Sequence, residues 1–480
     1  MIQSIINSSN YKWWVFGTIA IGIFLSVMDI GAIQVALPVI ESYFQTDLPT
    51  VQWVVVAYAL SICVLLLPMG RLGDLIGRKQ VYIAGFSIYV VAAAVSTISP
   101  DVFMLIGFRI AQGVGSAMIQ SNAMAMIISV FPSSERGKAL GSNMSIVGSG
   151  FIVGPALGGF LVSYFDWWAV FFINVPIGIV AILVAVLVLR SDKAAKNDTP
   201  TNRFDWLGAI FSGVALFLLL LIVGNGTKFG WASPLILIST GLFVIFTMGF
   251  IFWELRCPRP MLQLRLFKRR LVALGVTAGW LSFFGISATR FLLPFYLQKL
   301  LGLTPGQVGL LLIPAAVCMI IFGPLSGRLS DRFGWRYLTM GGLGLSTMAS
   351  FVLVLTLTET SSVILIVAML MLQSAGLGLF NSPNNSSIFS AVEPSDFGVV
   401  SALTQLVRNS ANVLSVALAT SIVVTVMAFR GAPPSLDSVS PDVALAFVDG
   451  LRLAFLVLGC FTLIGFFIAF IRGERVVDSN

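Results

Sequence analysis

Histidine is absent from this sequence of 480 residues, and only 10% of the residues carry a charge. Without histidine, the chain lacks the side chain that most often titrates near neutral pH and ligates metals. The only Gly-Lys pair, Gly137-Lys138, is followed by Ala139 and does not form a nucleotide-binding P-loop. We therefore expect no cofactor, metal or nucleotide, and no enzymatic active site. The cysteines are scattered without disulfide or metal-ligand spacing, at Cys63, Cys257, Cys318 and Cys460.

The scarcity of charge also excludes water as the solvent for most of the surface, because a soluble domain carries about 25% charged residues. Hydrophobic residues make up 58% of the chain, and they fall in runs of roughly 20, the length that crosses a bilayer as a helix. Backbone groups in lipid must pair internally, and the run length favours helices over barrel strands. We expect an all-α polytopic membrane protein with fourteen spans, which begin near Trp13, Val51, Gln80, Val102, Ala139, Trp168, Asp205, Pro234, Leu271, Gln307, Tyr337, Val363, Val399 and Gly450.

The basic residues predict the orientation of these spans. The polar segment Met1 to Lys12 is too short for a signal peptide, so we expect the first span to be retained. Most of the 28 Lys and Arg residues fall in segments on the same side as the termini, whereas Lys228, Lys299 and Arg430 fall on the other side. This bias predicts cytoplasmic termini in a plasma (inner) membrane protein. The net charge of +8 is thus a topology signal with some attraction for membrane lipid, and we expect no nucleic-acid partner.

An internal repeat divides the chain. The segment Gly70-Arg-Leu-Gly-Asp-Leu-Ile-Gly-Arg-Lys79 recurs as Gly327-Arg-Leu-Ser-Asp-Arg-Phe-Gly-Trp-Arg336, and both copies fall on the predicted inner side. This repetition predicts two homologous six-helix halves, residues 1–190 and 270–480, joined by a linker with two inserted helices, residues 191–269.

The repeated segment has a chemistry beyond that of a positive anchor. Gly70 and Gly77 permit close helix contact and a tight turn, and Asp74 is suited to accept hydrogen bonds at a helix N-terminus. We expect a latch that holds one conformation and releases it in another, although a simple topology anchor is the alternative. The expected latch residues are Gly70, Arg71, Asp74, Gly77, Arg78, Lys79, Arg328, Asp331 and Arg332.

At these motifs the chain resembles the major facilitator superfamily, and within it the fourteen-helix drug:proton antiporter family. Besides the inner-loop repeat, three segments carry the resemblance: Asp29 to Pro38, Arg109 to Gly115, and the antiporter motif with Gly150, Gly154, Pro155, Gly158 and Gly159. The stretch from Phe171 to Gly178 and the pair Trp53 and Tyr58 also fit. The chain departs from the family pattern at Gly31, Gln34 and Trp168, and near the second half's Arg408 at Ala411, Asn412 and Ser415. These departures leave the substrate open.

The antiporter glycines form a stripe at four-residue spacing. Close helix packing explains such a stripe, and a functional reading adds a bend at Pro155 and a seal against the facing half. The two readings are compatible.

Asp29 is the only acidic residue predicted to lie deep within a span. A carboxylate at mid-membrane is costly, so it is usually functional or paired, and one whose neighbours differ between two conformations changes its proton affinity. We expect Asp29 to couple transport to protons, with Arg109 and Arg408 as its partners or as charges that tune its pKa; a permanent structural ion pair is the alternative. Arginine stays protonated and cannot carry the proton.

Deep charge is thus biased toward the positive, which favours neutral, zwitterionic or anionic amphipaths over dicationic drugs. Arg290 faces either the cavity or the outer interface, and Arg452, beside Asp449, suits a surface role. We expect the substrate cavity to include Gln34, Tyr58, Gln112, Asn122 and Arg290.

These features favour a monomeric, proton-coupled secondary antiporter that exports hydrophobic or amphipathic small molecules, as in multidrug efflux. An exporter of lipid-like amphipaths on the same scaffold is the main alternative. A proton-coupled solute symporter comes third, because the antiporter motif disfavours it.

Overall fold

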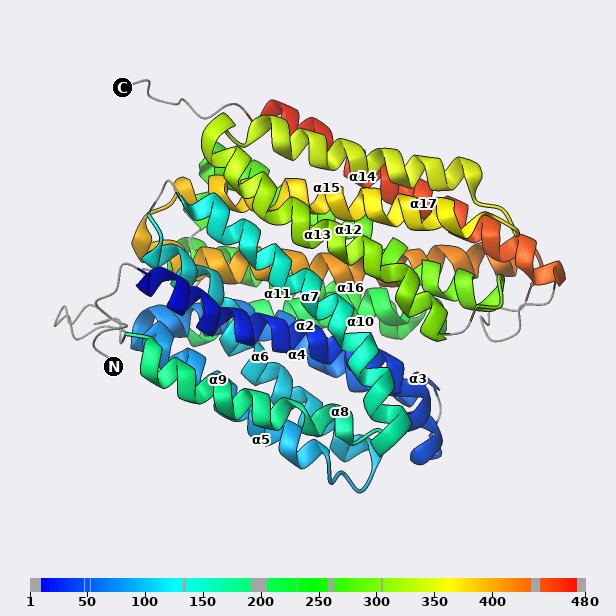
Figure 1. Cartoon of the computed structure of the whole chain (residues 1–480), viewed down its shortest axis with the longest axis horizontal. Helices are drawn as coiled ribbons and strands as arrows, with labels where there is room; N and C mark the ends of the chain where they lie inside the picture. The colour runs from blue at the N-terminus through cyan, green and yellow to red at the C-terminus, as the bar shows by residue number, and fades with distance from the viewer. Residues whose placement is uncertain are drawn as a thin grey trace.

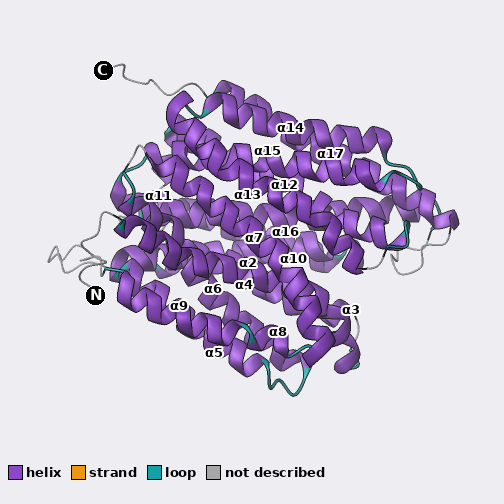
Figure 2. Cartoon of the chain, in the orientation of Figure 1, coloured by secondary structure: helices purple, strands orange, loops and turns teal. Residues whose placement is uncertain are grey.

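The computed structural model describes residues 10–46, 48–51, 53–132, 135–190, 205–230, 232–257, 262, 264–303, 305–432 and 441–472. Within these ranges every regular element is a helix (Figure 2). The α-helices are α2 (Tyr11–Tyr43), α3 (Leu48–Val51), α4 (Trp53–Ile76), α5 (Arg78–Ser96), α6 (Val102–Val130), α7 (Arg136–Phe165), α8 (Ala169–Phe172), α9 (Asn174–Val188), α10 (Trp206–Phe229), α11 (Pro234–Arg256), α12 (Arg270–Lys299), α13 (Pro305–Phe333), α14 (Arg336–Thr356), α15 (Val363–Ser390), α16 (Phe397–Phe429) and α17 (Pro441–Ile471). Two 3-10 helices, η2 (Leu264–Lys268) and η3 (Pro394–Asp396), precede α12 and α16.

Fourteen helical stretches in the described residues are long and apolar enough to cross a membrane, which confirms the predicted number. The last of them begins at Val443, earlier than the predicted start near Gly450. The helix continues through Asp449 because this carboxylate is neutralised by ion pairs with Arg430 and, at 3.5 Å, with Arg452.

The helix ends follow local side-chain chemistry. Asp101 caps α6 by accepting hydrogen bonds from the backbone N–H groups of Phe103 and Met104, at 2.8 and 2.9 Å. Asp205 caps α10 through Gly208 N–H, at 2.9 Å. Several spans contain internal prolines, which are tolerated in a membrane bundle because neighbouring helices satisfy the freed backbone groups; they include Pro68, Pro155, Pro294, Pro314, Pro324 and Pro383.

The helices form two bundles that lie side by side (Figure 1). The N-terminal half comprises α2 to α9, and the C-terminal half comprises α12 to α17. The halves meet mainly where α7 packs on α13 and where α16 packs on α4 and α6. Of the inserted pair, α10 packs on α4 and α16 and so touches both halves, and α11 packs on α10. Residues 191–204, the start of the predicted linker, lie outside the described residues.

The start of α2 and the end of α17 lie at the same end of the bundle (Figure 1). We call this the termini end, and the opposite end the far end. Helix α2 begins at the termini end, and each following membrane-spanning helix runs in the opposite direction to the one before it. Both copies of the repeated segment therefore lie at the termini end.

Candidate functional site

Asp29 of α2 forms a fully buried ion pair with Arg109 of α6. Both side chains have 0% exposure, and the guanidinium Nη1 lies 2.8 Å from Oδ2 of the carboxylate. The other carboxylate oxygen, Oδ1, accepts hydrogen bonds from Asn174 Nδ2 at 2.8 Å and from Gln112 Nε2 at 3.4 Å. The carboxylate thus has the charge and the donors that a buried anion requires.

Arg109 is held from several sides. Its Nε donates to the Val54 carbonyl oxygen at 2.9 Å, and its Nη1 also donates to Gln112 Oε1 at 2.6 Å. The guanidinium lies 4.0 Å from the centre of the Tyr58 ring, a cation–π geometry. Helices α2, α4, α6 and α9 therefore meet at one charged cluster. The sequence does not predict that Asn174 belongs to this cluster, although Asn174 lies inside the Phe171 to Gly178 motif.

A chain of polar side chains leads from this cluster to the other half. The Tyr58 hydroxyl donates to Ser116 Oγ at 2.9 Å, and Gln120 Nε2 donates to the same Oγ at 2.9 Å. Arg408 Nη2, on α16, then donates to Gln120 Oε1 at 3.2 Å. The expectation that Arg408 partners Asp29 directly is therefore wrong in this conformation. The four-residue spacing of Gln112, Ser116 and Gln120 on α6 is the sequence signal for this polar stripe.

The residues expected to line the substrate cavity divide into three groups. Tyr58 and Gln112 belong to the buried Asp29 cluster, with 0% exposure. Asn122 is also fully buried and donates to the Met69 and Met118 carbonyl oxygens, so it lies in the contact between α4 and α6. In this conformation these three side chains do not face open space. Gln34 is exposed and Arg290 is half-buried.

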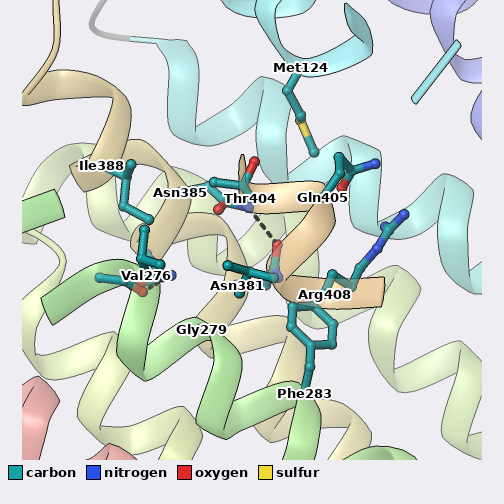
Figure 3. Close-up of a pocket in the computed structure, with 13 residues that line it drawn as sticks. Met124, Val276, Gly279, Phe283, Asn381, Asn385, Ile388, Thr404, Gln405 and Arg408 are labelled. Atoms are coloured by element: carbon teal, nitrogen blue, oxygen red, sulfur yellow. Dashed lines mark hydrogen bonds between the residues drawn. The ribbon is translucent and has the colours of Figure 1, made fainter. Parts of the chain in front are cut away.

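A pocket lies on the termini side of Arg408, between α12, α15 and α16 of the C-terminal half and Met124 of the N-terminal half (Figure 3). Its polar lining is mainly amides, including Asn381, Asn385 and Gln405, and Asn385 donates to Asn381 Oδ1 at 2.9 Å. Phe283 supplies an aromatic wall. The pocket therefore combines hydrogen-bonding groups, an apolar surface and one cation.

The repeated segments join the halves at the termini end. Asp331, in the second copy, accepts hydrogen bonds from the backbone N–H groups of Gly137 and Lys138, at 3.3 and 3.2 Å, in the first turn of α7. Asp74, in the first copy, lies against the first turn of α16, where its Oδ1 is 2.1 Å from the position that a Cβ at Gly398 would occupy. Each Asp thus faces a helix N-terminus of the opposite half, where the helix dipole favours negative charge.

The first glycine of each copy also lies at this contact. A Cβ at Gly70 would be 2.5 Å from Ala402 Cβ, and one at Gly327 would be 2.0 Å from the Gly137 carbonyl oxygen. Both distances are too short for any side chain, so glycine is required for the halves to close at this end. Gly77 has φ of 107°, a backbone conformation that glycine alone adopts readily.

The basic residues of the expected latch show no hydrogen bond or ion pair to the opposite half in the described part of the chain. Arg78 donates to Asp74 Oδ1 from Nε and Nη2, at 3.1 and 3.0 Å, four residues along the chain. Lys79 donates to the Val186 and Leu189 carbonyl oxygens at the end of α9, within its own half. Arg71 is half-buried, and Arg328 and Arg332 are exposed. The contacts of Arg78 and Lys79 therefore stay within the N-terminal half.

A neighbouring ion pair ties the start of α2 to the residue before α7. Lys12 Nζ lies 2.6 Å from Glu135 Oε2. The hydrogen bond from Lys12 lowers the pKa of the Glu135 carboxyl.

The antiporter-motif glycines pack within their own half, so the expected seal against the facing half is wrong for this stripe. Cβ atoms at Gly150, Gly154 and Gly158 would each lie within 3 Å of α2, and Pro155 contacts Gly31 of that helix. Gly159 has only an ordinary contact with Val35. Close packing on α2 is therefore what the motif does in this structure.

A different set of small residues on α7 faces the C-terminal half. Cβ atoms at Gly137, Gly141 and Gly148 would meet α13 at 3.1 Å or less, and Ser145 Oγ donates to the Ile320 carbonyl oxygen at 2.8 Å. Opposite them on α13 stand Gly323 and Gly327. This stripe was not identified from the sequence, although its spacing of small residues is visible there.

Comparison with known proteins places this architecture among transporters. Residues 19–416 match the family described as Major Facilitator Superfamily. A riboflavin transporter of Clostridioides difficile is 31% identical over 410 residues, which cover 85% of this chain and 87% of that protein. A multidrug resistance protein of Mycobacterium tuberculosis is 29% identical over 88% of this chain and 78% of its own length. A tetracenomycin C resistance and export protein of Streptomyces glaucescens is 31% identical over 67% of this chain and 59% of its own length.

The fold is also found among solved structures. A proton:xylose symporter of the same superfamily superposes with a TM-score of 0.68 at 14% identity, over 97% of each chain. At this identity the likeness concerns the fold alone.

Proposed function

Because the chain belongs to the Major Facilitator Superfamily, and is therefore a transporter and not an enzyme, we propose that it is a proton-coupled antiporter that exports hydrophobic or amphipathic small molecules by alternating access. The observation that carries this proposal is the fully buried pair of Asp29 and Arg109. It supplies one exchangeable carboxylate inside a bundle whose two halves are held together at one end.

The ion pair of Asp29 and Arg109 supports coupling of transport to protons, because the pair is stable only while Asp29 is ionised. Ionised Asp29 holds Arg109, Gln112 and Asn174 in one arrangement. A proton on the carboxylate removes the charge that Arg109 faces, and a buried cation without its partner is strongly destabilised. Arg109 then favours another position, and Tyr58, Ser116 and Gln120 transmit that change toward Arg408 in the other half. Protonation of one side chain thereby biases the arrangement of the two halves.

Alternating access is supported by the contacts at the termini end, where Asp331 and Gly327 meet the start of α7 and Gly70 meets α16. These contacts must break when the termini end opens. We place the protein in the cell membrane with both termini cytoplasmic, on the strength of the basic residues at that end. A cycle of two halves within one chain needs no second copy, which favours a monomer.

Export of amphipathic molecules is supported by the relatives named for drug resistance and for tetracenomycin C export. The relative named as a riboflavin transporter widens the range of cargo to be tested.

The test is transport of a dye panel and riboflavin into everted membrane vesicles with an acid interior. Asp29→Asn is expected to abolish proton-driven accumulation and the dependence of transport on pH, because the amide resembles the protonated acid in shape but cannot release a proton. Downhill exchange is expected to survive. Asp101→Asn is the matched control, since asparagine still caps α6. Proton-coupled accumulation by Asp29→Asn at the wild-type level would refute the assignment and leave the pair a structural one.

A further inference from the structure

Two arginines inside the spans, Arg290 and Arg408, have no acidic partner among the described residues. By contrast, the deeply buried Arg109 pairs with Asp29, and Arg452, nearer the far end of α17, pairs with Asp449. Arg408 donates to Gln120, and Arg290 donates to Ser374 Oγ at 3.1 Å and contacts Met319 Sδ at 3.4 Å. A guanidinium carries five N–H donors, so these neutral contacts leave its charge without compensation.

Arg290 lies beside a residue of the other half. Its guanidinium is 5.8 Å from the centre of the Phe151 ring, which belongs to α7 of the other half and is 43% exposed. Phe151 follows Gly148 by one turn of α7, and Gly148 is the last small residue of that stripe to contact α13. Arg290 is thus half-buried beside an accessible aromatic ring that lies on the far-end side of the α7 glycines in contact with α13.

Arg408 lies on α16 and lines the pocket toward the termini end. It lines the pocket in Figure 3 together with Phe283, which precedes Arg290 by two helical turns on α12. The remaining polar lining consists of amides and the Thr404 hydroxyl, and the lining contains no carboxylate. Met124 comes from the N-terminal half, so the shape of this pocket depends on how the halves are arranged.

We propose that Arg290 and Arg408 recognise an ionised acidic group, so that the preferred cargo is an amphipathic organic acid: a carboxylate or an ionised phenol on an aromatic body. This inference rests on the proposed transport function and narrows its substrate class. Arginine binds such anions through strong charge-assisted hydrogen bonds. Each guanidinium lies beside an aromatic side chain, Phe151 or Phe283, that suits the apolar body of the same molecule. A cation would instead meet two uncompensated positive charges.

The test uses two dyes that share a xanthene ring system, fluorescein, which is anionic at pH 7.5, and rhodamine 123, which is cationic. Binding to the purified protein in detergent is measured by fluorescence polarisation, with protein-free micelles as the blank. Wild type is expected to bind fluorescein at least about 10-fold more tightly than rhodamine 123. Arg290→Gln and Arg408→Gln are each expected to weaken fluorescein binding by about 10-fold or more, the loss expected for one charge-assisted hydrogen bond, and to leave rhodamine 123 binding unweakened.

The exposed Arg256→Gln, on α11, is the matched control and is expected to bind both dyes as wild type does. Melting temperatures identify any glutamine variant that does not fold. In that case the lysine variant at the same position, Arg290→Lys or Arg408→Lys, is measured instead. Because lysine retains the positive charge, this variant is expected to keep the preference for fluorescein over rhodamine 123. The inference is overturned if wild type does not prefer fluorescein, or if both glutamine variants bind it normally. Binding in detergent requires no proton gradient, so failure here is distinct from failure of the Asp29 experiment.

Discussion

At the scale of single residues, the polar stripe on α6 connects two charges that lie in different halves. Gln112 contacts the Asp29 and Arg109 pair, and Gln120, two turns along, contacts Arg408. Between them, Ser116 accepts hydrogen bonds from both Tyr58 and Gln120. Gln120 is therefore the side chain through which the N-terminal cluster reaches the C-terminal half.

We predict that Gln120→Leu slows transport by about 10-fold. This factor lies within the roughly 5- to 150-fold range of typical coupling between two sites. Leucine has a similar size but removes the hydrogen bonds to Ser116 and Arg408, so protonation of Asp29 would no longer be transmitted. Initial rates in everted vesicles measure the effect. Ser121→Ala is the control, because the hydrogen bonds of that hydroxyl in the described part of the chain are local, with the Met118 carbonyl oxygen and the Asn122 amide of its own helix. A wild-type rate for Gln120→Leu would show that the halves are coupled by another route.

At the scale of elements, α7 carries two glycine stripes with different partners. Gly150, Gly154 and Gly158 pack on α2 of the same half, and Gly137, Gly141 and Gly148 pack on α13 of the other. Successive residues of an α-helix are rotated by about 100° around its axis, so Gly141 and Gly154 point about 140° apart. The first stripe therefore fixes α7 in its own half, while the second forms a surface that must separate in each transport cycle.

We predict different consequences for alanine in the two stripes. Gly327→Ala would place a Cβ 2.0 Å from the Gly137 carbonyl oxygen of the other half and 3.0 Å from the Ser382 hydroxyl of its own half. The shorter contact, with backbone, opposes closure of the termini end. We expect this variant to keep its melting temperature and to populate a conformation open at the termini end. Gly154→Ala would place a Cβ 2.7 Å from the Met28 carbonyl oxygen, inside one half. We expect that variant to lose about 1–3 kcal/mol of stability through overpacking.

The measurements are thermal unfolding and the distance between spin labels at the exposed positions Ile76 and Phe333, at the ends of α4 and α13. Gly107→Ala serves as the control, because nothing lies within 4 Å of the added Cβ. If Gly327→Ala left the label distances unchanged, the contact between α7 and α13 would tolerate a side chain, and the closed arrangement would not depend on glycine.

How far the sequence could predict these elements depended on the kind of signal. Run length and the sidedness of Lys and Arg predicted the fourteen spans because the bilayer sets the length of each helix. The partner of Asp29 could not be predicted, since Arg109 and Arg408 both lie deep in spans and only helix rotation decides which one reaches it. The same holds for the glycine stripe at Gly150: small residues indicate close packing, but not which helix is packed against.

At the scale of the whole molecule, the internal repeat generates a two-fold pattern at the termini end. Asp74 of the N-terminal half lies at the start of α16, and Asp331 of the C-terminal half lies at the start of α7. The repeated Gly and Asp make these contacts in both copies, whereas the hydrogen bonds of Arg78 and Lys79 stay within their own half. The repeat is therefore better explained by the contact between halves than by charge alone.

We predict that Asp74→Asn and Asp331→Asn each destabilise closure at the termini end and that their effects add. A carboxylate at a helix N-terminus contributes about 0.3–1 kcal/mol, and up to about 2 kcal/mol when partly buried, and asparagine keeps the shape while it removes the charge. Each substitution is thus expected to shift the equilibrium by roughly 2- to 30-fold toward the open termini end, and the double variant by the product of the two.

The distances between spin labels at Ile76 and Phe333 measure the populations of the open and closed conformations. Vesicle transport, which is expected to slow severely, measures the functional consequence. Asp101→Asn, at the far end of α6, controls for the loss of a capping charge elsewhere. A double variant with unchanged distances and normal transport would reduce both loops to topology anchors, and the closed state would then rest on the glycine contacts of α7 with α13 and of α4 with α16.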